Sequence, residues 1–98
     1  DFICKIDGKL YIGDLKTSSG IYPEYLVQTA AYRFARTEEF PEEKYTGQLI
    51  VRVGKDGSFE FAIMRDDVWY RKMFVAFLAA LKLQESLEEI KDFKVDRE

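Results

Sequence analysis

Residues 1–16, with the sequence DFICKIDGKLYIGDLK, decide the fold of this chain. Two runs rich in β-branched and aromatic residues, Phe2–Ile6 and Leu10–Leu15, flank the dipeptide Asp7-Gly8. Asp-Gly between two such runs is the strongest short-range signal for a β-hairpin. A two-residue loop would pair Ile3 with Ile12, whereas a three-residue loop would shift the pairing by one. The stretch predicts a hairpin whose register depends on the length of its turn.

The two-residue loop places two carboxylates opposite each other at the open end of this hairpin. Asp1 then faces Asp14, and side-chain alternation puts Lys16 on the same face. Opposed residues have Cβ atoms about 4.5–5.5 Å apart, a spacing at which like charges repel. A divalent cation explains such a pair, because Mg²⁺ is commonly held by carboxylates, water and phosphate oxygens. With Lys16 beside the ion, the set predicts phosphodiester hydrolysis; the alternative is three solvated surface charges.

The rest of the chain predicts one helix, a second hairpin and a long final helix. Pro23 suits the first turn of a helix, Pro41 follows its end, and Asp66 or Asp67 can cap the last helix. The expected elements are a helix over Pro23–Thr37, strands Tyr45–Val53 and Phe59–Met64, and a helix from Asp66 or Asp67 to about Ile90. The order is ββαββα, which makes the fold class α+β.

Apolar periodicity predicts which faces are buried. One face of the second hairpin is expected to be buried, and it carries Leu49, Val51, Val53, Phe59, Phe61 and Ile63. The final helix is expected to pack on the sheet through Trp69, Met73, Ala76, Phe77, Ala80 and Leu81.

Composition narrows the possible chemistry. The chain has 98 residues, enough for one domain, and a formal net charge of −3, which argues mildly against a bulk electrostatic nucleic-acid binder. The absence of histidine excludes Ser–His and Cys–His nucleophiles and His-bound zinc, and the single Cys4 fits a reducing, cytoplasmic setting. The apolar run Met73–Leu83 is too short to span a bilayer, so no membrane association is expected.

The ordered string Asp1 … Gly8-Lys9-x-x-Ile12-x-Asp14-x-Lys16-Thr17-Ser18 … Gln28-x-x-x-Tyr32 resembles the PD-(D/E)XK nuclease superfamily, specifically its RecB-like exonuclease branch. The resemblance covers Asp1 to about Tyr32, a third of the chain. It implies a restriction-endonuclease-like core of α/β sandwich type, with a mixed sheet flanked by helices. It also implies an acidic helix upstream of the first Asp. Because the chain starts at Asp1 without an initiator Met, we expect residues 1–98 to be a single nuclease-like domain truncated at its N-terminus.

The resemblance also implies roles for individual residues. Asp1 and Asp14 would bind Mg²⁺ or Mn²⁺, with the backbone carbonyl of Leu15 on the same ion. Lys16 would be the catalytic lysine, acting together with Asp14.

Four further residues would support the site or contact DNA. Gln28 and Tyr32 lie four apart, so they share one helix face. In the family such a pair supports the site and contacts the DNA backbone. Thr17 and Ser18 would touch DNA or cap the strand.

For other polar and aromatic residues, two roles are possible. Arg33 and Arg36 could track a DNA strand or complement the helix dipole. Tyr22 and Tyr25 could stack on bases, although aromatic packing is favoured. The turn Lys55–Gly57 carries no functional signal.

The expected function is therefore a metal-dependent deoxyribonuclease that acts on a DNA substrate. By the RecB-like resemblance alone it would be an exonuclease of recombination, repair or phage DNA processing. A homo-oligomer or a recombination or helicase partner is left open. The alternatives are a catalytically silent nuclease-like domain that binds DNA or protein, and a structural domain in which the motif arises by chance.

Overall fold

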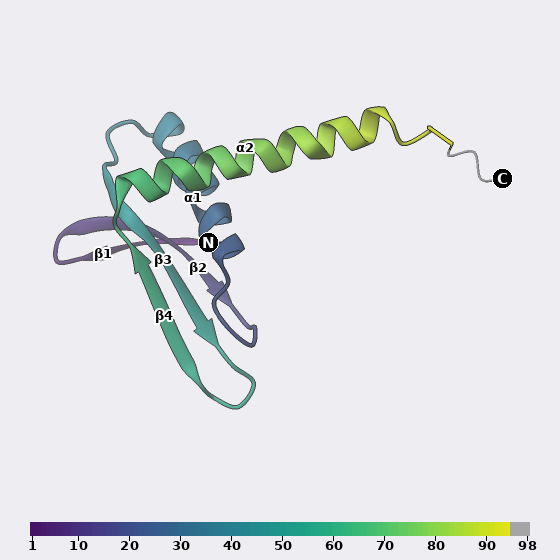
Figure 1. Cartoon of the computed structure of the whole chain (residues 1–98). Helices are drawn as coiled ribbons and strands as arrows, with labels where there is room; N and C mark the ends of the chain where they lie inside the picture. Colours follow the sequence, from purple (N-terminus) through teal and green to yellow (C-terminus); the bar gives the residue numbers. More distant parts are fainter. Residues whose placement is uncertain (95–98) are drawn as a thin grey trace.

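The computed structural model describes residues 1–94 and contains a four-stranded sheet and two helices (Figure 1). The elements are β1 (Phe2–Ile6), β2 (Lys9–Lys16), α1 (Pro23–Glu39), β3 (Tyr45–Val53), β4 (Phe59–Met64) and α2 (Asp67–Glu89). The α+β class is confirmed, and α1 runs two residues further than predicted. Neither helix in the described part of the chain is long and apolar enough to cross a membrane.

The β1–β2 hairpin has the predicted two-residue turn. Asp7 and Gly8 both have positive φ, 51° and 76°, as a type I′ turn requires. The strands pair antiparallel, with Ile3 opposite Ile12 and Phe2 opposite Gly13. This register excludes the three-residue loop. It also brings the open end of the hairpin to Asp14, the next residue of β2.

The sheet is mixed, in the order β1-β2-β3-β4. The β1–β2 and β3–β4 pairs are antiparallel, whereas β2 and β3 are parallel and are joined through α1. The parallel register sets Asp14 beside Ile50 and Lys16 beside Arg52. Beyond Gly13, β2 pairs with β3 alone in the described chain. The second half of β2 therefore has one open edge.

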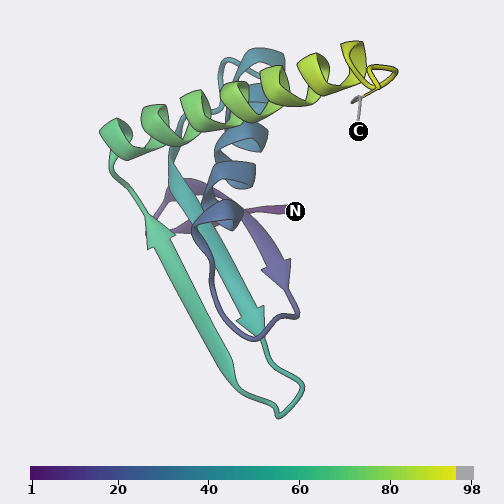
Figure 2. The same ribbon diagram turned by 45° about the vertical axis from the view of Figure 1, so that its right-hand side comes forward.

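Helix α1 packs on one face of the sheet, against β2 and β3 (Figure 2). The contact surface is partly polar: the Gln48 amide donates to the Leu26 carbonyl and to the Thr29 hydroxyl, both at 3.0 Å. Gln48 and Thr29 are fully buried, as are Ile50 and Ala30. Strand alternation puts the side chains of Asp14 and Lys16 on this same face.

The predicted buried face of the second hairpin is largely wrong: of its six residues only Leu49 is buried, at 7% exposure. Its six residues do share one face, since Leu49 pairs with Ile63 and Val51 with Phe61. However, Gln48 and its alternate neighbours face α1, so this set lies on the opposite side. There Phe59 is 62% exposed and Phe61 59% exposed. The error arises because the α1-facing side of β3 carries Gln48 and Arg52 beside Ile50, so the alternation of apolar residues indicated the other face.

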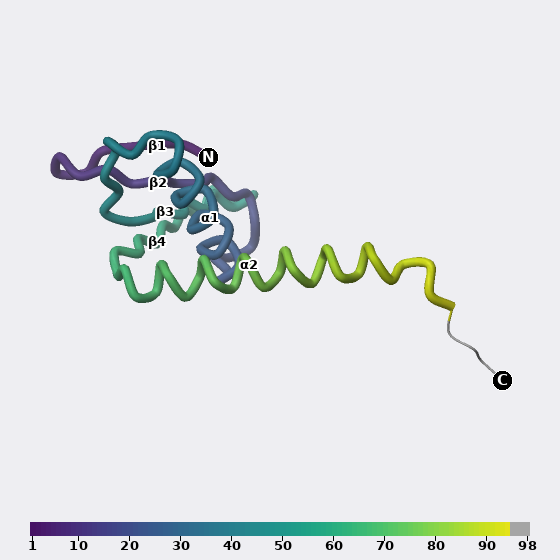
Figure 3. The backbone as a smooth tube through the Cα atoms, turned by 90° about the horizontal axis from the view of Figure 1, so that it is seen from above, coloured from purple at the N-terminus to yellow at the C-terminus, as the bar shows by residue number. Residues whose placement is uncertain are grey.

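The predicted packing of α2 on the sheet is also wrong, because α2 packs on α1 instead. Phe74 stacks on Phe34 of α1 with ring centroids 4.1 Å apart. Asp66 caps the helix as predicted and accepts hydrogen bonds from the next turn. Beyond α1 the helix continues away from the sheet, and Trp69 at its start is 54% exposed (Figures 1 and 3). The predicted core residues of α2 therefore contact α1 and not the sheet. Within residues 1–94, no helix covers the sheet face opposite α1.

Candidate active site

Asp14 and Lys16 form an ion pair on the α1-facing side of β2. The Lys16 ammonium lies 2.8 Å from Asp14 Oδ2. Their side chains point the same way because they are two residues apart on a strand. The Asp14 side chain is only 14% exposed, so the pair is partly shielded from water.

Helix α1 adds two contacts to this pair. The Lys16 ammonium donates to Gln28 Oε1 at 2.9 Å. It also lies over the Tyr25 ring, 4.8 Å from the centroid, which is within the range of a cation–π contact. Lys16 and Gln28, predicted separately on a strand and a helix, are therefore brought together.

These contacts favour the charged form of Lys16. The hydrogen bond to Asp14 is the largest cause of a raised Lys16 pKa, and the nearby carboxylate charge acts in the same direction. Partial burial works against both.

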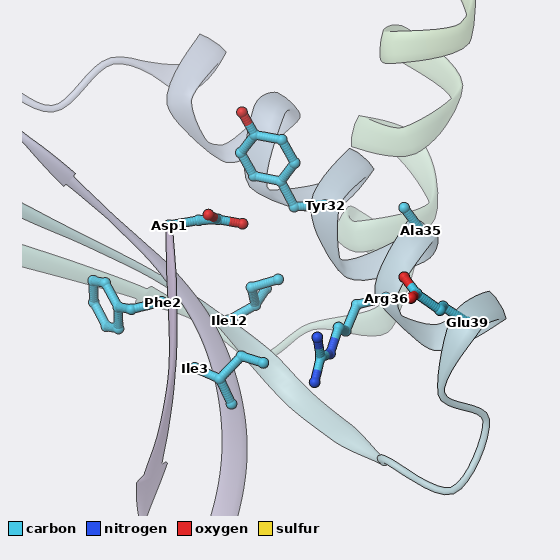
Figure 4. Close-up of a pocket in the computed structure, with 8 residues that line it drawn as sticks. All are labelled: Asp1, Phe2, Ile3, Ile12, Tyr32, Ala35, Arg36 and Glu39. Atoms are coloured by element: carbon cyan, nitrogen blue, oxygen red, sulfur yellow. The ribbon is translucent and has the colours of Figure 1, made fainter.

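Asp1 lies next to Asp14 at the open end of the hairpin, as predicted. The last paired residues are Phe2 and Gly13, and the main-chain nitrogen of Asp1 is 3.6 Å from Asp14 Oδ1. Figure 4 shows the Asp1 side chain on the same side of the hairpin as Ile12. The oxygen donors of Asp1 and Asp14 match the preference of Mg²⁺ and Mn²⁺ for hard ligands. Among residues 1–94, no three Asp, Glu, Cys or His side chains come together as metal ligands.

The other predicted site residues lie around this centre. Leu15 sits where β2 has its open edge, and its side chain points to the opposite face. Thr17 and Ser18 follow β2 directly, and the Ser18 hydroxyl donates to the Gly20 carbonyl at 2.8 Å. Tyr32 is one helical turn after Gln28 and partly exposed. The structure thus gathers all of them near the Asp14–Lys16 pair.

A cavity of about 380 Å³ separates the start of β1 from α1. Its apolar floor is formed by Ile3 and Ile12, and its rim carries Asp1, Tyr32 and Arg36 (Figure 4). The end of the hairpin that carries Asp1 therefore opens onto a hollow that Tyr32 borders.

The two arginines of α1 both have partners in other segments of the protein. Arg33 is buried, donates to the Tyr45 carbonyl at 2.8 Å and stacks on Tyr70. Arg36 makes two hydrogen bonds of 2.9 Å to the Glu43 carboxylate. Both side chains tie α1 to the segments that follow it.

The Glu43 contact makes a pH-dependent contribution to stability. Arg36, and secondarily the Tyr45 hydroxyl, lower the pKa of Glu43 from its ordinary 4.5 to about 2. A depressed carboxyl pKa stabilises the fold above the ordinary value, and this stabilisation is lost as pH falls toward the depressed value. We expect Glu43→Gln to lower Tm at pH 7, with the difference from wild type shrinking between pH 4.5 and pH 2.

The matched control for this prediction is Glu42→Gln, an exposed neighbour. Thermal unfolding followed by circular dichroism from pH 2 to pH 7 would measure both variants. A Glu43→Gln difference in Tm that stays constant over this range would contradict the assignment.

Two residues near the site have contacts that the sequence did not predict. Tyr25, for which base stacking and aromatic packing were both considered, lies under Lys16. Arg52 is the neighbour of Lys16 across the parallel strands. In the sequence, Arg52 stands out only as a charged residue within a predicted strand. Its proximity to Lys16 depends on the pairing of β2 with β3, which the sequence did not predict.

The chain matches no known protein-family model, and no curated protein matches it in sequence. The resemblance to RecB-like nucleases therefore rests on the ordered residues from Asp1 to Tyr32. The contacts among Asp14, Lys16 and Gln28 are independent of that resemblance, because they follow from the fold of this chain.

Proposed function

We propose that this chain is the catalytic region of a deoxyribonuclease that depends on Mg²⁺ or Mn²⁺. The observation that supports this most is the position of the Lys16 ammonium, which contacts both Asp14 and Gln28. Asp1, the second carboxylate of the proposed site, is at the same end of the hairpin, with its main-chain nitrogen 3.6 Å from Asp14 Oδ1. Two acidic residues and a lysine on one sheet face are the groups that metal-assisted phosphodiester hydrolysis requires.

Each residue of the proposed site has its own role. Asp1, Asp14 and the Leu15 carbonyl would hold the ion, which when bound supplies a Lewis acid and a water of lowered pKa. Lys16 stabilises the negative charge that develops on the phosphate as water attacks in line. Gln28 orients the Lys16 ammonium by its hydrogen bond.

The fold is compatible with a restriction-endonuclease-like core. The proposed site is carried by a hairpin and by the helix that follows it, which is the arrangement that the RecB-like resemblance implies. Exonuclease action, in recombination, repair or phage DNA processing, follows from that resemblance alone. A cytoplasmic setting is proposed from the single Cys4, and a further copy or a helicase partner is left open.

A catalytically silent DNA- or protein-binding domain is the second candidate. It is favoured by one observation: residues 1–94 bring no third metal-ligating side chain to Asp1 and Asp14. A site with two carboxylates still binds Mg²⁺, because water and substrate oxygens supply the remaining ligands. The nuclease and the silent domain would therefore have the same residues, and only a measurement of activity distinguishes them.

Cleavage of end-labelled linear DNA tests the proposal. We expect degradation with Mg²⁺ or Mn²⁺, none in EDTA, and recovery when the metal is restored. Asp14→Asn should lower the rate about 100-fold or more, because it removes one charge from the proposed metal site.

Asp7→Asn serves as the matched control, since Asp7 lies in the turn at the far end of the hairpin and Asn tolerates its positive φ. Cleavage in EDTA would refute metal dependence. DNA binding without cleavage under any of these conditions would favour the silent domain.

A further inference from the structure

A polar groove of about 710 Å³ lies at the ends of β2 and β3, next to the candidate active site. One wall is the segment after β2, with Thr17, Ser18 and Ser19, and the other is the β3–β4 turn from Gly54 to Ser58. The groove starts directly beside Lys16, because Thr17 follows Lys16 in the chain.

Buried Arg52 holds the two walls together. Arg52 is 6% exposed and forms the floor of the groove. It donates to the Ser18 carbonyl at 3.0 Å and to the Ser58 hydroxyl at 3.2 Å, while Glu60 balances its charge. The shape of the groove is therefore fixed by hydrogen bonds that cross it.

Aromatic side chains connect the groove to Lys16. The Ser19 and Tyr22 hydroxyls are hydrogen-bonded at 2.6 Å. Tyr22 packs edge-to-face on Tyr25 with centroids 5.5 Å apart, and Tyr25 lies under Lys16. One continuous surface of hydroxyls and rings thus leads from the catalytic lysine into the groove.

The charges at the mouth of the groove have both signs. Lys55 is exposed at the tip of the turn. Asp56 accepts a hydrogen bond from the Ser58 amide at 2.9 Å, and the hydroxyl of Ser58 contributes most to the lowered pKa of Asp56. Asp56 is therefore ionised at neutral pH and opposes the attraction of Lys55 for an anion.

We propose that this groove binds the sugar–phosphate backbone of the substrate strand beside the scissile phosphate, with Lys55 on one phosphate. The inference rests on the proposed nuclease function and adds the β3–β4 turn to its DNA-binding surface. Hydroxyls, a lysine and the exposed ring of Tyr22 suit a nucleic-acid strand, whose phosphates accept hydrogen bonds and whose bases stack on rings.

Salt dependence of DNA binding provides the test. Binding of end-labelled DNA would be measured in Ca²⁺ between 50 mM and 200 mM salt, with cleavage in Mg²⁺ measured in parallel. We expect Lys55→Ala to raise Kd about 3- to 10-fold at low salt, and the ratio of the variant and wild-type Kd values to fall about 3.5-fold across this range. One lost phosphate contact releases one counterion fewer, which gives this change.

Two further variants test the effect of charge on Kd and provide a control for the loss of a lysine. Asp56→Asn keeps an acceptor for the Ser58 amide and removes the negative charge, so Kd should fall about 2-fold. Lys9→Ala removes an equal charge at the other end of β2, about 23 Å from Lys16 at the usual rise per residue, and should leave Kd near the wild-type value.

The outcomes separate the two proposals. If wild type cleaves DNA while Lys55→Ala matches Lys9→Ala in Kd and salt dependence, the groove inference is overturned and the nuclease function stands. If Lys55→Ala changes Kd and its salt dependence as predicted but wild type never cleaves DNA, the nuclease function fails while the groove inference is supported. A wild-type protein that does not bind DNA overturns the groove as well.

Discussion

Replacing Lys16 with methionine is expected to lower kcat for DNA hydrolysis about 10²- to 10³-fold, with a much smaller change in KM. Methionine keeps an unbranched apolar stem and removes the ammonium that contacts Asp14 and Gln28. The loss should fall on kcat because the charge on the phosphate is greatest in the transition state. Single-turnover cleavage of end-labelled DNA in Mg²⁺ would measure it.

Lys5→Met is the matched control for this variant. Lys5 is an exposed lysine that shares the α1-facing side of the hairpin but lies toward its turn, opposite Leu10. Its activity should stay within about 3-fold of wild type, a difference of less than 1 kcal/mol. Thermal unfolding of both variants would separate lost catalysis from lost folding. If folded Lys16→Met cleaves as fast as Lys5→Met, Lys16 has no catalytic role.

Replacing Ile50 with alanine is expected to lower the free energy of unfolding by about 2–5 kcal/mol. Ile50 is fully buried in β3 under α1, and it is the neighbour of Asp14 across the parallel strands. Truncation would lose buried apolar contacts and leave a cavity that strands on both sides prevent from closing. Urea unfolding at constant m-value would measure the change.

Val53→Ala, on the same strand but the opposite face, provides the comparison. Val53 is 39% exposed, so its truncation should cost about 1 kcal/mol or less. Equal costs for the two variants, or a larger cost for Val53→Ala, would mean that α1 does not cover the Ile50 face. Such a result would also remove the basis for the contacts of α1 with Lys16.

The elements and the first hairpin could be predicted because their signals are local. Asp7-Gly8 permits two consecutive positive φ angles, which determine both the turn and the register of the strands. Alternation then puts Asp14 and Lys16 on one face without reference to the rest of the chain. The same reasoning failed for α2, where apolar spacing indicated a contact face but could not say that α1, and not the sheet, would meet it.

The site was predictable to the same extent. Asp1, Asp14 and Lys16 follow from hairpin geometry, and Gln28 and Tyr32 share a helix face because they lie four residues apart. The contact of Gln28 with Lys16 needed the resemblance to suggest it and the packing of α1 to produce it. Of the Arg52-centred groove only Thr17 and Ser18 were predicted to contact DNA, because Arg52 and Ser18, which its hydrogen bond joins, lie 34 residues apart.

The opening hairpin therefore illustrates what sequence alone determines in this protein: turn, register and the placement of Asp1, Asp14 and Lys16 on one face. Tertiary structure alone decided which face of the sheet is buried. Strand β3 carries Leu49, Val51 and Val53 on the face that α1 leaves uncovered, so its apolar pattern indicated the wrong face. The choice is made by α1, which joins β2 to β3 in parallel and lies over Ile50 and Gln48. Long-range packing of this kind cannot be inferred from the periodicity of either segment.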